Sequence, residues 1–330
     1  PPEQLRGRAL QIDSMFLGTP FDMHMAKNRL AVLDTKQEDS LLFIVDPVQE
    51  KVIGRGLPKG NGPGEVVMSR FMHKGAEQDI LYFYDSQMFR YLRVNVDSLI
   101  NFPAYKAKTV ASFSYEIPMV YYAVRLHNKH FLTSAATDKG RFLYLDEQAR
   151  VKAHLYNYPQ DNHPDASNEV KALAYQLQFA LQPGGERVAG MGMFGAFIDI
   201  FETEGEDIAR TRQLYFFTPS YEVLRTEDFS AAPIKGDGKF GFIKSAGTKE
   251  YLYTLYANKT WSELKENAQS RNENPKAKYI LVFNWDGEPV KALQLPHPAY
   301  AIAVNRKNDM LYALESHPEP TIVEYSLDLP

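Results

Sequence analysis

The chain has 330 residues, enough for one large domain or two ordinary ones, and 20 Tyr with 20 Phe favour the half-buried surfaces of β-sheets. With 37 Lys and Arg against 41 Asp and Glu, the net charge is −4, so nucleic acid is not an expected partner. The absence of cysteine excludes disulfides, thiolate metal sites and a cysteine nucleophile, and no apolar run approaches the roughly 20 residues of a transmembrane helix.

A strand-like segment, rich in aromatic or branched residues and often ending on an acidic residue, recurs along the chain. Four clear copies occur, at 30–34, 80–85, 251–256 and 310–315. Two weaker copies occur at 131–133 and 187–189. Repetition of this kind is the signature of repeat folds, in which each unit is completed by its neighbours. We interpret the copies as the second strands of six similar units.

Further strands are predicted around each copy. First strands are expected at 23–26, 70–73, 122–125, 176–181, 242–245 and 301–304, and third strands at 43–46, 89–95, 142–146, 197–201, 279–285 and 321–326. Fourth strands are expected at 52–55, 110–115, 153–156, 214–217 and 290–295. The sixth unit lacks a fourth strand, whereas a strand candidate at 9–12 has no unit of its own.

These segments predict an all-β fold, a six-bladed β-propeller of four-stranded antiparallel blades in which the N-terminal strand closes the ring. Closure of this kind leaves only short sheet edges exposed. A single domain over residues 1–330 is expected. Two β-sandwiches are the alternative, but no linker rich in Pro, Gly or Ser divides the chain.

Two segments depart from the strand pattern and predict short helical insertions. In 165–181, apolar residues recur at helical spacing behind the possible caps Asp165 and Ser167. In 260–268, Trp261 and Leu264 begin a similar apolar face.

The segment after the first unit resembles a family signature. It reads Gly54-Arg55-Gly56 followed by Gly60-Asn61-Gly62-Pro63-Gly64-Glu65, and is similar to the G-x-G-P-G-E loop of the TolB-like six-bladed propellers, candidate lipoproteins of gut anaerobic bacteria. Three more stretches resemble family signatures: 174–176 followed by 183–185, then 256–260, and 282–287. One position differs, since Val66 stands where the family usually has Phe.

The resemblance implies a propeller that is exported to the periplasm or the cell surface. It also implies that a lipid-bearing cysteine usually begins the mature protein, so contact with a membrane is expected only through such an anchor. Members of the family are largely uncharacterised, and the resemblance implies no activity.

Several short motifs have simpler structural interpretations. Two G-x-G-x-x-G strings, at 190–195 and 236–241, precede strands rather than helices, so turns or close-packed strands are expected instead of dinucleotide sites. His127 and His130 are the closest histidine pair and are expected in a solvated turn, so neither a metal site nor a cofactor is predicted. The hydrolase motif G-x-S-x-G is absent.

The glycine-rich loop could form an anion-binding nest of backbone amides. Pro63 removes one of the donors, and Gly and Pro are the residues that tight turns require. We therefore expect a rigid connector whose structural residues are Gly56, Gly60, Gly62, Pro63 and Gly64.

Four long non-strand stretches are predicted to meet on one face of the propeller: the glycine-rich loop, 158–172, 226–239 and 258–278. Insertions in repeat proteins gather on the binding face. A ligand is therefore expected at the channel mouth on that face, where charged side chains could orient it and aromatic rings could stack on it. The candidate residues are Arg55, Glu65, His163, Asp165, Tyr175, Asp237, Lys259 and Trp261.

Three functional hypotheses remain open. The first is a monomeric, non-enzymatic recognition module for a glycan, a peptide or an envelope protein. The second is an enzyme, either a lyase or a lactonase-like hydrolase, with its site in the central channel, since scattered inward ligands escape spacing rules. The third is a structural partner within an envelope complex.

Overall fold

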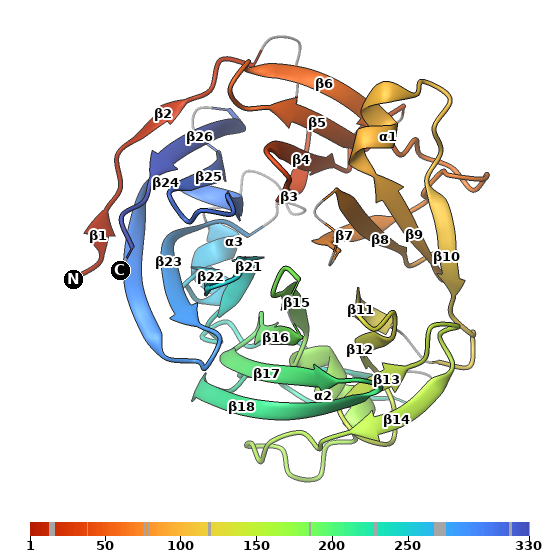
Figure 1. Cartoon of the computed structure of the whole chain (residues 1–330). Helices are drawn as coiled ribbons and strands as arrows, with labels where there is room; N and C mark the ends of the chain where they lie inside the picture. Colours follow the sequence, from red (N-terminus) through yellow and green to blue (C-terminus); the bar gives the residue numbers. More distant parts are fainter. Residues whose placement is uncertain are drawn as a thin grey trace.

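The computed structural model describes residues 1–12, 17–37, 39–75, 77, 79–117, 120–184, 186–226, 230–266, 275–316 and 319–329. Six antiparallel blades stand radially around a central axis, in chain order (Figure 1). Each blade runs from an inner strand beside the axis to an outer strand at the rim. The six-bladed propeller predicted from the repeats is confirmed.

The first four blades are separate four-stranded sheets. Blade 1 contains β3 (Pro20–Ala26), β4 (Arg29–Asp34), β5 (Leu42–Asp46) and β6 (Lys51–Gly56). Blade 2 contains β7 (Ser69–Lys74), β8 (Ile80–Asp85), β9 (Arg90–Asn95) and β10 (Lys108–Ser112). Blade 3 contains β11 (Val120–Arg125), β12 (Phe131–Ala135), β13 (Phe142–Leu145) and β14 (Val151–Leu155). Blade 4 contains β15 (Leu177–Leu181), β16 (Arg187–Gly192), β17 (Ala196–Glu204) and β18 (Asp207–Phe217).

Blades 5 and 6 share one strand. Blade 5 contains β21 (Phe242–Gly247), β22 (Tyr251–Tyr256), β23 (Ala277–Asn284) and the first part of β24 (Pro289–Val304). The rest of β24 is the inner strand of blade 6, beside β25 (Met310–Glu315) and β26 (Thr321–Ser326). The two blades therefore form one continuous sheet.

The N-terminal segment closes the ring as predicted, although the strand lies slightly earlier than expected. β2 (Gly7–Ala9) pairs antiparallel with β26, and the Leu10 N–H continues the ladder to the Ile322 carbonyl at 2.9 Å. Before it, β1 (Glu3–Gln4) adds a parallel strand to the outer edge of blade 5. The N-terminal segment thus bridges the last two blades (Figure 1).

The second strands are almost continuously apolar because neighbouring blades cover both of their faces. All six residues of β8 are buried. Leu33 and Ile44 of blade 1, for example, share one apolar cluster with Phe83 and Leu92 of blade 2. A strand buried on both faces loses the apolar and polar alternation of a half-exposed strand. This burial explains why the second strands were the clearest repeat in the sequence.

Acidic residues at the ends of β4 and β8 have the same role in two blades. Asp34 accepts hydrogen bonds from the backbone N–H groups of residues 18 and 19, at 2.6 and 3.0 Å. Asp85 accepts them from residues 67 and 68, at 3.1 and 3.2 Å. Both carboxylates are completely buried. Each one therefore fixes the segment that enters the inner strand of its own blade.

Both predicted helical insertions are present, and a further helix was not anticipated. α2 (Asn168–Ala174) and α3 (Trp261–Glu266) match the predicted segments, but α2 ends before 177–181, which form β15. Ser167 is the α2 N-cap by position, although its side chain makes no capping hydrogen bond. α1 (Val96–Asn101) follows β9 and is capped by the Asn95 side chain, which accepts from the Ser98 N–H at 2.6 Å.

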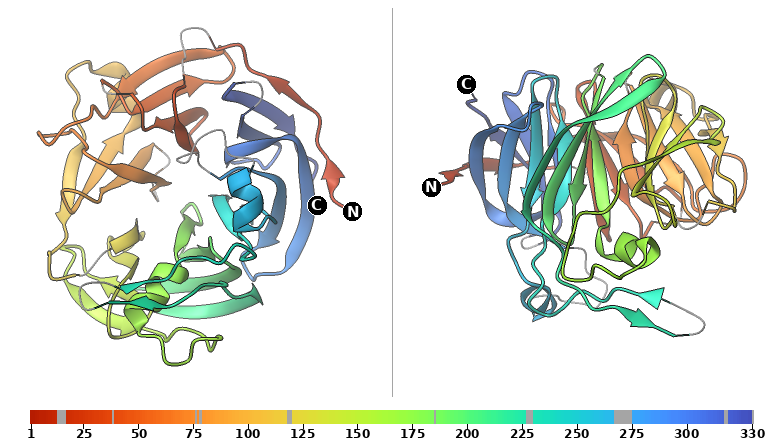
Figure 2. Two further views of the ribbon diagram at one scale, coloured as in Figure 1. Left: turned by 180° about the vertical axis from the view of Figure 1, so that it is seen from behind. Right: turned by 90° about the horizontal axis from the view of Figure 1, so that it is seen from below.

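The insertions gather on one face of the ring, as expected. α2, α3 and the hairpin of β19 (Leu224–Arg225) and β20 (Ser230–Ala231) project from the same side of the propeller (Figure 2). We call this side the insertion face. Among the described residues, no helix combines the length and apolar character needed to cross a membrane.

Candidate functional site

Side chains fill the central channel. The channel lies between the inner strands β3, β7, β11, β15 and β21 and the last part of β24, and its two cavities have volumes of about 20 Å³ each. A cavity of that size holds about one water molecule. Neither of these two cavities can hold a substrate, and the expected ligand position at the channel mouth stays a prediction.

An ion pair crosses the channel near the insertion face. The Lys244 Nζ atom lies 3.3 Å from an Asp22 oxygen, and the ammonium group packs over the Phe21 ring at 4.4 Å. Burial raises the pKa of Asp22, but the charges of Lys244 and His24 outweigh this effect and lower the pKa to about 2. Burial also lowers the pKa of Lys244. The pair ties the inner strands of blades 1 and 5 together.

A neutral histidine lies deeper in the channel wall. Burial lowers the pKa of His73 to about 3. Its Nδ1 atom lies 3.1 Å from the Lys74 carbonyl, and its Nε2 atom contacts the Tyr91 hydroxyl. A neutral ring meets both partners when Nδ1–H donates to the carbonyl and Nε2 accepts from the hydroxyl. His73 therefore connects strands inside blade 2.

The structure brings His163 and Tyr175 together but gives them structural partners. The Tyr175 hydroxyl donates to Asp161 at 2.9 Å, and Tyr221 donates to the same carboxylate at 2.8 Å. The His163 Nε2 atom lies 2.9 Å from the Tyr221 carbonyl, while Asp165 is exposed on the same insertion. These contacts attach the 158–172 insertion to the segment after β18. A ligand role for the three candidates stays a prediction.

Asp237, Lys259 and Trp261 form a second group on the insertion face. The Trp261 N–H donates to the Gly238 carbonyl at 2.9 Å, and the Trp261 ring stacks on Phe240 at 5.4 Å. The backbone of Lys259 pairs with the same segment, and Asp237 is exposed. This group packs residues 259–261 against blade 5, whereas residues 267–274 of the predicted 258–278 insertion lie outside the described residues. The ligand role of the group also stays a prediction.

Arg55 and Glu65 lie apart from both groups. Arg55 is on the outer strand β6, where its guanidinium packs over the Phe43 ring at 4.8 Å. Glu65 folds back into its own loop and accepts from the Gly62 N–H at 2.8 Å. Arg90 donates to the Glu65 carbonyl at 2.6 Å. The eight candidates therefore do not converge on one pocket.

The glycine-rich loop is built as a connector. A Cβ at Gly60 would collide with the Glu65 side chain, a Cβ at Gly62 would press tightly against it, and Gly64 has a positive φ of 81°. The Glu65 carboxylate already accepts a hydrogen bond from the Gly62 N–H, and Arg90 donates to the Gly62 and Glu65 carbonyls. The Gly62 N–H is therefore not free to bind an anion.

The two G-x-G-x-x-G strings are close-packed, as expected. The Gly241 N–H donates to the Met193 carbonyl at 2.7 Å, and a Cβ at Gly241 would overlap the Gly195 carbonyl. The two strings thus meet each other where blade 4 contacts blade 5. Glycine is needed there for backbone approach rather than for phosphate binding.

The prediction of a solvated turn at the histidine pair is wrong for His130. His130 is buried, and its Nδ1 atom lies 2.7 Å from the Tyr144 hydroxyl, whereas His127 is exposed and contacts Thr203. Within the described ranges, no three His, Asp or Glu side chains are grouped closely enough to hold a metal ion.

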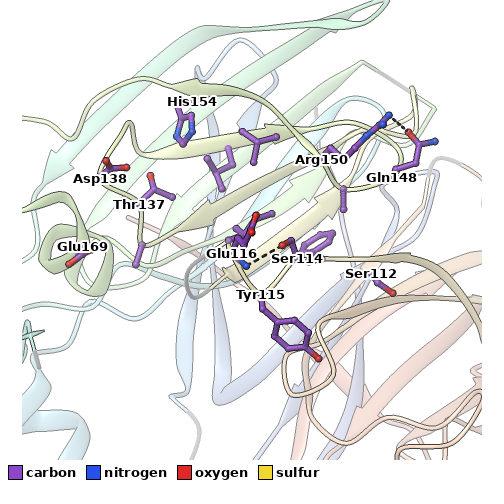
Figure 3. Close-up of a pocket in the computed structure, with 16 residues that line it drawn as sticks. Ser112, Ser114, Tyr115, Glu116, Thr137, Asp138, Gln148, Arg150, His154 and Glu169 are labelled. Atoms are coloured by element: carbon purple, nitrogen blue, oxygen red, sulfur yellow. Dashed lines mark hydrogen bonds between the residues drawn. The ribbon is translucent and has the colours of Figure 1, made fainter. Parts of the chain in front are cut away.

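A large groove lies between the outer parts of blades 2 and 3 (Figure 3). Its volume is about 1050 Å³, comparable with the upper range of ligand pockets. Residues 113–117 after β10, residues 136–138 after β12 and Glu169 of α2 line its end on the insertion face. The lining residues are Ser112, Phe113, Ser114, Tyr115, Glu116, Ile117, Ala136, Thr137, Asp138, Leu143, Gln148, Ala149, Arg150, Val151, His154 and Glu169.

The groove combines an aromatic ring, an apolar floor and polar groups. Tyr115 is 78% exposed, and its ring contacts Phe89 at a centroid distance of 4.8 Å. Phe113 and Leu143 are buried beneath it. Hydroxyl, amide and carboxylate groups surround these residues (Figure 3). The groove can stack on a flat ligand surface and hydrogen-bond its edges.

Sequence reasoning missed every residue of the groove. The residues come from two blades, and the 110–115 segment was expected to be a strand, whereas β10 ends at Ser112. The exposed aromatic at Tyr115, beside Ser114 and Glu116 in a connection between blades, is the one signal that could have suggested a contact surface.

The radial blades and the closing N-terminal strand define a six-bladed β-propeller. The sequence model of the family described as TolB-like 6-blade propeller-like matches residues 2–307. The chain therefore belongs to the TolB-like six-bladed propeller family.

Solved structures support the same fold. A member of the duf4221 family from Bacteroides vulgatus has a TM-score of 0.57 at 13% identity, covering 98% of this chain and 97% of that one. A candidate exported protein from Bacteroides fragilis has a TM-score of 0.52 at 12% identity, covering 97% and 94%. The Cps50 (Swd1) propeller domain of Myceliophteria thermophila has a TM-score of 0.51 at 11% identity, covering 95% and 99%. No curated protein has a sequence that matches this chain.

Proposed function

We propose that this protein is an exported recognition module that binds a glycan in the groove between blades 2 and 3. The groove carries the proposal, because its volume is about 1050 Å³ and its lining is mixed in polarity, whereas the two central cavities among the described residues have volumes of about 20 Å³ each. Export is supported by membership of the TolB-like family and by the similarity to the Bacteroides fragilis protein.

The chemistry of the groove favours a sugar. Tyr115 offers an exposed ring face that can stack on the apolar face of a pyranose. The carboxylates of Glu116 and Asp138 can accept hydrogen bonds from sugar hydroxyls, and the Gln148 amide can both donate and accept. The volume allows several linked rings. The proposed ligand position is therefore the groove between the outer parts of blades 2 and 3, and not the mouth of the central channel.

The test is a glycan array followed by calorimetric titration of the best oligosaccharide. Tyr115→Ala should weaken its binding about tenfold, since an aromatic contact contributes about 0.5–1.5 kcal/mol beyond its buried area. Phe102→Ala is the matched control, because Phe102 is a 64% exposed ring on the segment after α1, outside the groove. It should leave affinity unchanged.

Three outcomes would contradict the proposal. The first is an array without specific binding, and the second is binding that Tyr115→Ala leaves intact. The third is selective binding of an extended peptide in the same groove, which would retain the site but replace the ligand class.

A further inference from the structure

A buried guanidinium lies where blade 3 contacts blade 4. Arg141 precedes β13 and is only 1% exposed. Its Nη1 atom donates to Asp199 at 2.9 Å and to the Tyr215 hydroxyl at 2.8 Å. Its Nε and Nη2 atoms are also buried, yet neither has a hydrogen-bond partner among the described residues. One edge of the guanidinium is therefore satisfied, and the other edge is not.

Aromatic rings surround the same group. The guanidinium carbon lies 4.6 Å from the Phe197 centroid, 4.8 Å from Phe142 and 5.7 Å from Tyr175. Tyr158, from the 158–172 insertion, lies 5.9 Å away. Aromatic rings interact favourably with a guanidinium but do not replace the hydrogen bonds of its N–H groups. The open edge still requires an acceptor.

The local charges do not balance. Arg141 and Arg210 both pair with Asp199, at 2.9 and 3.1 Å, and Asp199 is completely buried. Within the described part of the chain, no other carboxylate forms an ion pair with either arginine. Two cations therefore share one carboxylate, and Arg141 is the buried one of the two, since the Arg210 side chain is 21% exposed. An uncompensated buried charge is costly, and a second anion would remove that cost.

The neighbouring strand supplies another unsatisfied polar atom. Ser134 on β12 faces the same side of blade 3 as Phe142, to which it is paired in register. Its Oγ atom is buried and has no hydrogen-bond partner among the described residues. A serine hydroxyl can donate to an anion beside an arginine.

We propose that Arg141 anchors a carboxylate-binding site between blades 3 and 4, beneath the insertion face. The Nε and Nη2 groups form the fork that binds two carboxylate oxygens in parallel, and the surrounding rings pack on the apolar part of the ligand. The ligand is a small free carboxylate or the acid group of a larger molecule that reaches the same fork. This site is separate from the groove and does not depend on the glycan proposal.

The direct test follows the Arg141 Nε–H resonance in ¹H–¹⁵N spectra during titration with sodium acetate at constant ionic strength. The signal is assigned by its loss in Arg141→Met. Saturable movement of this signal with acetate, and not with chloride, is the expected result. Hexanoate and a uronic acid then distinguish a free carboxylate from the acid group of a larger ligand.

A second readout keeps the test independent of spectral quality. Acetate should raise the melting temperature of the wild-type protein. The apparent Kd for acetate should increase at least about tenfold in Arg141→Met, since charge-assisted hydrogen bonds are strong. Arg212→Met is the control, because Arg212 is exposed on β18 of the neighbouring blade and should respond like the wild type. Should Arg141→Met fail to fold, Ser134→Ala and the wild-type titration decide the question.

Two results would overturn the proposal. One is a wild-type signal that does not respond to acetate but shows contact with a long-lived water, which would mean that water alone satisfies Arg141. The other is equal stabilisation by acetate in the wild type, Arg141→Met and Arg212→Met, which would mean a general salt effect.

Discussion

The ion pair across the channel gives the sharpest stability prediction. Asp22→Asn leaves the Lys244 charge buried without its partner, and Lys244→Met leaves the Asp22 charge in the same position. Removing one partner of a buried pair costs about 3–5 kcal/mol. Removing both charges avoids that penalty. We therefore expect the double variant to lose less free energy of unfolding than the sum of the losses in the two single variants. A coupling free energy of about 2–3 kcal/mol is expected.

The pair also predicts an acid-sensitive contribution to stability. The folded pKa of Asp22, about 2, lies below its ordinary value of 3.8, so the folded state binds the proton less readily than the unfolded state. The difference of 3.8 − 2 = 1.8 pKa units corresponds to about 2.4 kcal/mol. This contribution is present above about pH 4 and is lost as the pH falls toward 2. Asp22→Asn should abolish it.

Urea unfolding followed by tryptophan fluorescence and circular dichroism measures all four members of the cycle. The surface pair of Lys152 and Glu206 is the control, because its side chains are 34% and 81% exposed although their charged atoms lie 2.8 Å apart. Exposed pairs contribute about 0–1 kcal/mol. Additive losses at Asp22 and Lys244, or equal coupling in both cycles, would refute the reasoning.

Three further predictions concern other parts of the fold. Asp85→Ala should lower the free energy of unfolding by about 3–5 kcal/mol in urea titrations, because it leaves buried amides unpaired, whereas Asp46→Ala at an exposed turn should cost about 1 kcal/mol. His73 should stay neutral down to about pH 3 in NMR titrations, and, since its folded pKa lies below its unfolded value, its burial should reduce stability as the pH falls from 6.5 toward 3. Gly241→Ala should prevent normal folding, because its Cβ would overlap a backbone carbonyl, while Gly205→Ala, with φ 59° and open space, should cost only about 1 kcal/mol in the same assay.

Local patterns predicted the strands because burial by neighbouring blades is visible in the sequence itself. The 80–85 segment is apolar on both faces, and Asp85 ends it because its carboxylate holds the segment that enters β7. β18 was only partly predicted: its expected part, 214–217, is the end of a longer strand whose largely exposed residues 207–213 carry little apolar signal.

The sites could not be predicted in the same way, because their parts are far apart in the chain. Asp22 and Lys244 belong to different blades, and each looks like an ordinary polar residue within an inner strand. Arg141 resembles any charged residue before a strand, and only the packing of two blades reveals that one edge is unsatisfied. The long insertions were conspicuous in the sequence, yet most of their candidate residues attach the insertions to the blades.

The antiparallel pairing of β2 with β26 has a consequence for the order in which the blades form during synthesis. Arg8 bonds Glu324 across 316 positions of sequence, so this contact waits until nearly the whole chain has left the ribosome. The earlier blades can form from local contacts, whereas the last blade stays incomplete until the N-terminal segment returns to it. During that interval, β26 exposes an unpaired edge to other chains. Deleting residues 3–10 should therefore promote association of newly made protein more than it disturbs blades 1 to 4.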